Sequence, residues 1–534
     1  MKKMTKRWVA FLMAAMLLFG LAACASDSSV GSNPSQKPTP TDPPSTPAPT
    51  PAPTPAPTDP PSTSKDGEIV KADMLSDSDL RYVMIYNPKI YNPNTYSDNS
   101  KLTLGALGTQ VDIWANKGDG LDEEPPAIIP ISQDWSSYLP KDIPLEENRA
   151  DAMGRDYQKG DVQSFYYSYS GDLSNRNQQE FVCNYAGQYC YIWSVAGEVS
   201  QTAIDDLGQT FDSKIYTSVA SCFGTPRFVG ETGKVNILLY DIQSAYLGYF
   251  TPIDTFVESE LPYVGLDGIP CNTGHAIINV NAVYLASSDT YELVLSTMAH
   301  ELQHLINFSA LFETANGASM DVWLNESMSG YIEEQLYPGA KETAGHYDSF
   351  NRSGLIRNGQ SLYNFKTSIS YMDFDIGVYG SVYYFSKYLE DLNGADTFSA
   401  IMDYWRDSYS STLNTTEALA KSVSASTYSK IDKSIDYSGL SLRFNSAEEE
   451  WVSKLTLQFY LELLANSENI PQFNNVDHNA LLYDSIGGAD LEGGGRIIVA
   501  LSGNTFEIPA NSDSGLIYVG LDKDFQVVTD FVCN

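Results

Sequence analysis

The sequence predicts an α+β protein in which a helical region lies between two regions rich in β-strands. Short stretches of alternating polar and apolar residues, such as 163–169 and 180–195, predict strands before residue 200. Between about 201 and 435, apolar residues recur at spacings of three and four, which predicts mostly helices. Apolar stretches at 496–501 and 515–519 predict strands again near the end of the chain.

Residues 1–24 have the pattern of an export signal. Cations near the start precede an apolar stretch from Trp8 to Leu18, and small residues then lead to Cys24. The apolar stretch is shorter than the roughly 20 residues that a membrane-spanning helix needs. A cysteine directly after Leu-Ala-Ala resembles the lipobox of bacterial lipoproteins. This resemblance implies that Cys24 is lipidated and holds the protein at the extracellular face of the bacterial cell membrane.

The composition of residues 25–67 predicts a disordered stalk. From Pro34 to Ser64 the chain consists mostly of Pro, Thr, Ala and Ser, a composition that cannot bury a core. In the polyproline II conformation, at about 3.1 Å per residue, such a segment reaches on the order of 90 Å. The stalk is therefore long enough to carry a folded domain away from a membrane surface.

The chain after the stalk is too long for a single ordinary domain. Its pattern predicts a β-rich N-terminal domain at 68–200, a second domain at 201–435 and a C-terminal helical and β region at 436–534. The formal net charge of −35 argues against nucleic acid as a partner. The acidic residues Asp119, Asp122 and Glu123 are of the type that binds calcium, which makes Ca²⁺ a candidate ion.

Besides Cys24 the sequence has an odd number of cysteines, so at least one cannot pair within the chain. They are Cys183, Cys190, Cys222, Cys271 and Cys533. Cys183 and Cys190 flank the turn of a predicted hairpin, which makes a local disulfide between them reasonable. The sequence leaves the other pairings open.

Residues 289–308 predict one uninterrupted helix. Asp289 suits the N-cap, and Glu292 follows at the position of a capping box. An apolar stripe runs along one side, at Leu295, Met298, Leu302 and Leu305. At about 100° per residue, His300 and His304 fall on roughly the opposite side, so the helix packs on one face and presents two imidazoles on the other.

His300, Glu301 and His304 form a His-Glu-x-x-His motif in this helix. Histidines one turn apart have side chains about 6 Å from each other, close enough for both to bind one Zn²⁺ ion. Glu301 lies between them, where it can take a proton from a water molecule that the ion has made acidic. The motif therefore predicts a catalytic zinc centre.

A catalytic zinc ion needs a third protein ligand and an open position. Asn307 and Ala310 stand where the metzincin pattern has a glycine and a histidine, which excludes that subclass. About twenty residues after the motif, a predicted helix at 320–336 contains an Asn-Glu pair that resembles the gluzincins, and its Glu326 is the predicted third ligand. Glu333 and Glu334 on the same helix are the competing candidates.

Two stretches, 298–308 and 323–327, together resemble the hyicolysin family of zinc metallopeptidases. Shorter matches with that family lie elsewhere, at Gly160–Phe165, Phe211–Asp212, Gly248–Phe250 and Tyr379–Ser381. The resemblance covers about residues 155–395. It implies a zincin-like domain that holds one zinc ion through His300, His304 and Glu326, uses Glu301 in catalysis and acts on protein or peptide substrates.

Three parts of such a site are left open by the sequence. Gly330 stands where the thermolysin-like pattern has an acid that orients a zinc histidine, so the orienting group must lie elsewhere. Tyr379 opens a downstream helix and is the candidate donor to the oxyanion, with His346 as the alternative. Residues 274–279 are a candidate edge strand for an extended peptide, and His275 is expected to be a plain strand residue.

The leading functional hypothesis is a lipid-anchored zinc metalloendopeptidase. The alternatives are a binding lipoprotein that has zinc but no catalysis, and a surface adhesin that uses the tyrosine-rich N-terminal region. Glu301 favours an enzyme, because a pure binding protein has no use for a carboxylate at that position.

Overall fold

The computed structural model describes the protein over much of residues 69–532, with gaps. The described residues are 69–70, 81–90, 102–103, 156–168, 176–226, 229, 232–243, 247–257, 273–314, 320–338, 340, 359, 361–363, 377–408, 415–423, 444, 446–465, 470, 482–483, 490–500, 506–507 and 516–532. They mix helices and sheets, as the predicted α+β class requires. Cys24, the predicted stalk, the acidic residues at 119–123, Cys271, His346 and Cys533 lie outside them.

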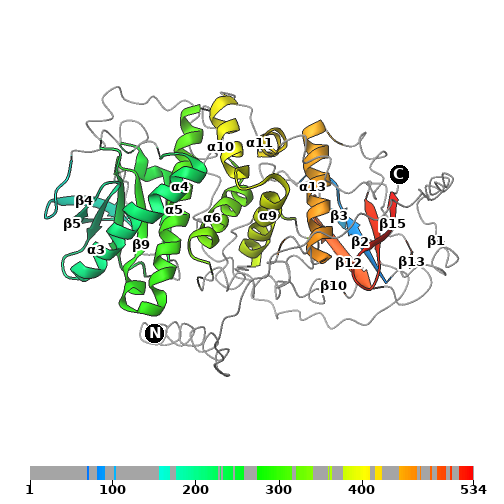
Figure 1. Cartoon of the computed structure of the whole chain (residues 1–534), viewed down its shortest axis with the longest axis horizontal. Coiled ribbons are helices and arrows are strands. Elements are labelled where there is room, and N and C mark those ends of the chain that lie inside the picture. Colours follow the sequence, from blue (N-terminus) through cyan, green and yellow to red (C-terminus); the bar gives the residue numbers. More distant parts are fainter. Residues whose placement is uncertain are drawn as a thin grey trace, which may run out of the picture. The chain divides into compact units, whose positions relative to one another are not determined.

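A six-stranded mixed sheet lies beside the long helix α5 (Ser288–Thr314) (Figure 1). In spatial order its strands are β4 (Val162–Tyr167), β5 (Asn177–Ala186), β6 (Cys190–Ser194), β7 (Val235–Tyr240), β9 (Ile277–Asn281) and β8 (Gly248–Phe250). Strands β6, β7 and β9 are parallel, whereas β4, β5 and β8 pair antiparallel with their neighbours. Strand β8 is therefore an edge, and it contacts α5.

Both faces of the central strands β6, β7 and β9 are buried, which explains why these strands are mostly apolar. Ile237 and Ile278 face the main core, which the helices share. Their neighbours Leu238 and Ile277 face a second core, rich in aromatic rings, on the opposite side. Successive side chains of a strand point to opposite faces, so one strand serves both cores.

The helices follow the predicted helical region and continue beyond it. They are α3 (Gln201–Thr210), the π-helical turn η3 (Phe211–Ile215), α4 (Tyr216–Phe223), the 3-10 turns η4 (Pro252–Thr255) and η5 (Ala282–Ala286), α5, α6 (Val322–Leu336), α9 (Gly377–Asn393), α10 (Thr397–Ser408), α11 (Thr415–Ser422) and α13 (Ala447–Leu464). The predicted apolar stripe of α5, from Leu295 to Leu305, is buried in the main core. The predicted N-cap was wrong, because α5 begins at Ser288 and Asp289 lies inside its first turn.

Cys183 and Cys190 do not form the expected disulfide, and both thiols are free and buried. Cys183 lies opposite Trp193 in the β5–β6 hairpin, and its side chain belongs to the aromatic core. Cys190 belongs to the main core on the other face of the sheet. A hairpin turn between two cysteines therefore does not suffice to predict a disulfide, because the strand pleat sends these two side chains to opposite faces.

A second sheet combines strands from the two ends of the described chain. Its spatial order is β10 (Leu482–Tyr483), β12 (Arg496–Ala500), β2 (Tyr82–Tyr86), β14 (Ile517–Leu521) and β15 (Val527–Val532). Strand β2 is central and pairs antiparallel with both β12 and β14. Two short pairs join the same regions, β1 (Ile69–Val70) with β13 (Phe506–Glu507) and β3 (Leu102–Thr103) with β11 (Asp490–Leu491).

The strands of the predicted region 68–200 are thus divided between two sheets. Strands β1 to β3 pair with C-terminal strands, whereas β4 to β6 share a sheet with β7, β8 and β9. A boundary at residue 200 consequently does not separate one sheet from another, and the remaining predicted boundaries stay predictions. Within the described residues, we find no helix with the length and apolar character that crossing a membrane requires.

Candidate metal centre

Helix α5 places the imidazoles of His300 and His304 side by side. Their Nε2 atoms lie 2.9 Å apart, and the ring planes are nearly perpendicular. The two side chains keep 13% and 12% of their surface exposed, although the opposite side of the helix is buried. The amphipathic pattern of α5 therefore fixes both rings at the boundary between the core and solvent.

Helix α6 brings Glu326 to the same point. Its Oε2 lies 3.3 Å from Nε2 of His300, and its Oε1 lies 3.6 Å from Nε2 of His304. One donor atom from each of these three residues lies within 4.8 Å of the others. The structure thus brings together the three residues that the sequence predicts as ligands.

The packing of α6 explains why Glu326 reaches the histidines. Trp323, at the start of the helix, is buried and contacts the ring of Phe385 in α9. On the next turn Ser327 Oγ donates to the carbonyl oxygen of Val382 in α9, at 2.8 Å. Toward α5, Ser329 Oγ donates to Oε1 of Gln303 at 2.5 Å. Helix α6 is therefore held between α5 and α9, with Glu326 on the side toward α5.

The three donors fit a zinc ion. In a tetrahedral site with bonds of about 2.0–2.1 Å, ligand atoms lie about 3.3 Å apart. The two Nε2 atoms lie 2.9 Å apart, and each has a different oxygen of the Glu326 carboxylate near that distance, Oε2 at 3.3 Å from His300 and Oε1 at 3.6 Å from His304. Two imidazole nitrogens and one carboxylate oxygen are also a donor set that zinc enzymes use. Calcium prefers six to eight oxygen ligands, so this cluster does not suit it.

Electrostatic interactions hold the cluster together. Burial lowers the pKa of His300, but Glu333 and Glu326 outweigh burial and raise that pKa well above its usual value. Burial raises the pKa of Glu326, but His304 and His300 outweigh it and lower that pKa to about 2. Because imidazole must be neutral to bind an ion, metal binding at these residues is coupled to proton release.

Glu301 lies beside the cluster and is only 6% exposed. Its Oε2 atom is buried and has no hydrogen-bond partner among the described residues. Burial raises the pKa of its carboxyl group, and the nearby charges of His300 and His304 oppose this effect. The structure therefore places a buried carboxylate with an available oxygen next to the three donors.

Strand β8 runs close to Glu301, and Gly248 makes this possible. A Cβ atom at Gly248 would lie 2.6 Å from the carbonyl oxygen of Asn279, 2.7 Å from Thr297 and 3.6 Å from Cγ of Glu301. The first two distances are too short for a side chain at this position. The edge strand that was predicted at residues 274–279 was wrong, because β9 lies between β7 and β8 and the edge is β8.

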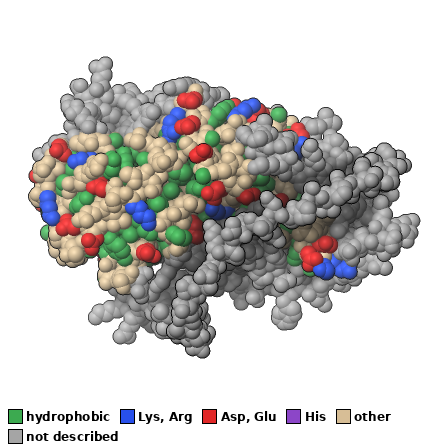
Figure 2. All heavy atoms as spheres, viewed as in Figure 1, with side chains coloured by type: hydrophobic (Ala, Val, Ile, Leu, Met, Phe, Trp, Pro, Cys, Tyr) green, Lys and Arg blue, Asp and Glu red, His purple; other side chains and the backbone are tan. Residues whose placement is uncertain are grey.

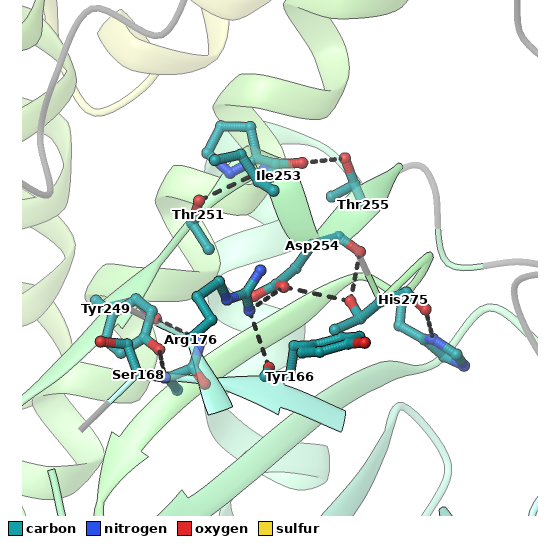
Figure 3. Close-up of polar contacts among 12 residues, drawn as sticks. Tyr166, Ser168, Arg176, Tyr249, Thr251, Ile253, Asp254, Thr255 and His275 are labelled. Atoms are coloured by element: carbon teal, nitrogen blue, oxygen red, sulfur yellow. Dashed lines mark hydrogen bonds and ion pairs between the residues drawn. The ribbon is translucent and has the colours of Figure 1, made fainter. Parts of the chain in front are cut away.

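A buried ion pair fastens the segment that follows β8 (Figure 3). Arg176 Nη2 donates to Oδ1 of Asp254 at 2.5 Å, and both side chains are fully buried. Arg176 also donates to the carbonyl oxygen of Tyr166, and the carbonyl oxygen of Asp254 accepts from the backbone N–H of His275. The pair therefore connects the β4–β5 hairpin with the residues that follow β8 and those that precede β9.

We expect Asp254→Ala to lower the free energy of unfolding by about 3–5 kcal/mol, because it removes the counter-charge of a buried guanidinium. Urea unfolding followed by circular dichroism measures the loss. The matched control is Asp205→Ala, whose partner Lys159 is 54% exposed, and it should cost less than about 1 kcal/mol. Equal losses in the two variants would contradict a structural role for the buried pair.

The other candidate residues occupy different places. Glu333 contacts His300 at Nδ1, the ring nitrogen that does not face His304, and the donor set contains neither Glu333 nor Glu334. His275 is buried beside Tyr157 and Phe165, and its Nδ1 lies 2.7 Å from the carbonyl oxygen of Thr273. It precedes β9, and burial lowers its pKa, so it is a core residue.

Tyr379 lies in the first turn of α9 and is half-buried against the main core. Helix α9 packs against α6, which carries Glu326. The role of Tyr379 as a donor to an oxyanion stays a prediction, as does that of its alternative, His346.

Sequence reasoning missed Ser329 as part of the site, and it named Glu333 only as a competing third ligand and Gly248 only within a family match. Gly248 looked like an ordinary family match, and its contact with Glu301 depends on how β8 lies against α5. A signal did exist for Ser329 and Glu333, because they lie three and seven residues after Glu326 and so share its side of a helix.

Comparison with known proteins relates the chain to metallopeptidases. No protein-family model matches it. It is 28% identical over 255 residues to the neutral metalloprotease ShpI of Staphylococcus hyicus, an alignment that covers 45% of this chain and 52% of that protein. The chain thus spans about half the length of the curated relative it matches. This distant similarity supports a metallopeptidase relationship, and the narrower hyicolysin assignment stays a prediction.

Proposed function

We propose that this chain is a zinc metalloendopeptidase with a zincin-like domain, in which His300, His304 and Glu326 bind one zinc ion and Glu301 transfers protons. The observation that carries the proposal is the convergence of the three donors within 4.8 Å of one another. The buried carboxylate of Glu301 beside them supports catalysis over metal storage. Similarity to a neutral metalloprotease supports the same reaction class.

A bound zinc ion supplies an electrophile for the peptide carbonyl group and lowers the pKa of a water molecule. The residues of the chain supply the proton transfer. Oε2 of Glu301 can accept a proton from the attacking water and pass it to the leaving amine. A buried carboxylate suits this task, because burial brings its pKa closer to neutral pH.

We propose that an extended peptide substrate lies along β8. This strand is the edge of the sheet nearest to Glu301, and an edge strand offers backbone groups that bind a peptide without selecting particular side chains. Gly248 keeps that edge close to the carboxylate of Glu301. We propose Tyr379 as the donor to the developing oxyanion.

We also propose that the enzyme is anchored through a lipidated Cys24 and acts at the extracellular face of the cell membrane. The order of cations, apolar residues and Leu-Ala-Ala-Cys supports this proposal. Replacing Cys24 by serine should move the protein from the membrane fraction to the medium. Unchanged membrane association of that variant would contradict the anchor.

The test of the proposed function is to purify the protein, measure zinc per chain and follow casein cleavage. We expect about one zinc ion per chain, loss of cleavage with a chelator and recovery when zinc is returned. Full cleavage by protein shown to be free of metal would contradict the proposal.

A further inference from the structure

Helix α6 turns one side toward the two histidines, and Glu326 is not alone on that side. At about 100° per residue, position 333 lies about 20° from position 326 around the helix axis, and position 329 lies about 60° away in the same direction. Ser329 and Glu333 are both buried. One side of α6 therefore presents Glu326, Ser329 and Glu333 to helix α5.

Each ring nitrogen of His300 lies next to a different glutamate on this side of α6. Nε2 lies 3.3 Å from Glu326, whereas Nδ1 lies 2.9 Å from Oε1 of Glu333. Glu326 and Glu333 are separated by about 10 Å along the helix axis, so the imidazole fits between their carboxylates. The contact with Glu333 is close, although the oxygen does not lie in line with the ring N–H.

We propose that Glu333 is the positioning residue for His300, an inference that rests on the proposed function. Its carboxylate lies 2.9 Å from Nδ1 and so favours the ring form with the proton on Nδ1, which leaves the lone pair of Nε2 directed at the site between His304 and Glu326. It also fixes the rotation of the ring, because a carboxylate that is 1% exposed has little freedom to move. Glu333 does not bind the ion itself.

In the thermolysin-like pattern the orienting acid lies four residues after the ligand glutamate, which here is position 330. The packing of Gly330 explains why the acid lies elsewhere in this chain. Position 330 is turned about 40° from Glu326 in the direction opposite to Glu333. A Cβ atom there would lie 3.6 Å from Cβ of Tyr383 in α9. That position therefore faces α9, and the side of α6 that faces His300 continues one turn later, at Glu333.

Ser329 has the corresponding contact with His304. Its Oγ lies 3.3 Å from Nδ1 of His304 and donates to Oε1 of Gln303, so it can accept a hydrogen bond from the Nδ1–H of the ring. Each histidine thus has an outer neighbour on α6, a carboxylate for His300 and a hydroxyl for His304. We expect the larger effect at Glu333, because charge-assisted contacts are stronger than neutral ones.

The experiment compares zinc and cobalt dissociation constants for the full chain and its variants, by competition with a chromogenic chelator. We expect Glu333→Gln to weaken binding by about 10–100-fold and to shift the absorption bands of bound Co²⁺, because the ring of His300 is less well held. Glu333→Asp keeps the charge and should bind metal more tightly than Glu333→Gln.

The matched control is Glu390→Gln. Glu390 in α9 also contacts α6, by accepting from the hydroxyl of Tyr331 at 2.8 Å. This variant should keep the affinity and the Co²⁺ spectrum of the wild-type protein. A similar loss of affinity in both variants would show that Glu333 acts only through general stability, and would overturn the proposal.

The outcomes separate this inference from the proposed function. If the wild-type chain binds no metal at these residues, the proposed function fails. If the wild-type chain binds metal and Glu333→Gln binds it within about twofold, only the role of Glu333 fails. Thermal unfolding of the metal-free proteins shows whether each variant is as stable as the wild-type protein. If Glu333→Gln does not fold, Glu333→Asp tests the same contact.

Discussion

Replacing Glu301 by glutamine is expected to lower kcat for peptide cleavage by about 10²–10⁴-fold while one zinc ion stays bound. Glutamine has nearly the same shape, but its amide cannot accept the proton that a carboxylate accepts. Glu301 is not among the three donors, so the site should keep its affinity for metal. The variant therefore separates proton transfer from metal binding.

The measurement combines casein cleavage, or cleavage of a quenched fluorescent peptide, with zinc content per chain. A matched control is Glu292→Gln, an exposed glutamate in the first turns of the same helix, which should keep full activity. If Glu301→Gln cleaved peptides at the wild-type rate, the assignment of Glu301 as the proton carrier would be wrong.

Replacing Glu326 by alanine is expected to weaken zinc binding by more than about 100-fold, beyond the range typical of residues that only orient a ligand. Only His300 and His304 would then remain from the donor set, and two imidazoles do not complete a catalytic zinc site. Activity at limiting zinc should disappear with the metal. Added zinc should restore little of it, because the geometry as well as the affinity is lost.

Zinc content after dialysis against a weak chelator measures this effect. Glu334→Ala is the control, since Glu334 is a glutamate of the same helix and was a competing candidate for the third ligand. It should retain its zinc. The opposite result, with zinc kept by Glu326→Ala and lost by Glu334→Ala, would transfer the ligand role to Glu334.

Local patterns in the sequence were sufficient for the elements that carry the metal centre. The apolar stripe of α5 predicted a continuous helix, and one helical turn between His300 and His304 predicted that their rings would be adjacent. The helical part that was predicted for the region 436–534 is present as α13. The spacing within one helix follows from its own geometry, so no information from distant residues was needed.

Patterns that depend on distant partners were not predictable in this way. Strand β2 is apolar and looked like part of an N-terminal domain, yet its neighbours in the sheet are β12 and β14, more than 400 residues later. The edge position of β8 also depends on pairing, with β9 on one side only. The disulfide between Cys183 and Cys190 failed for a local reason, because the pleat of the hairpin strands sends the two side chains to opposite faces. A strand pattern shows which side chains share a face, but it does not show which strand lies alongside.

The sequence by itself determined the two helices that carry the candidate metal centre, one with two histidines and a glutamate at metal-binding spacing and a second that offers a third ligand. Tertiary structure decided which carboxylate completes the donor set and which one only contacts Nδ1 of His300. Glu326 and Glu333 are the same residue type two turns apart on one helix, and the sequence favoured Glu326 only through the resemblance of its Asn-Glu pair to the gluzincins. The packing of α6 between α5 and α9 sets its position along α5, and that position assigns the two roles.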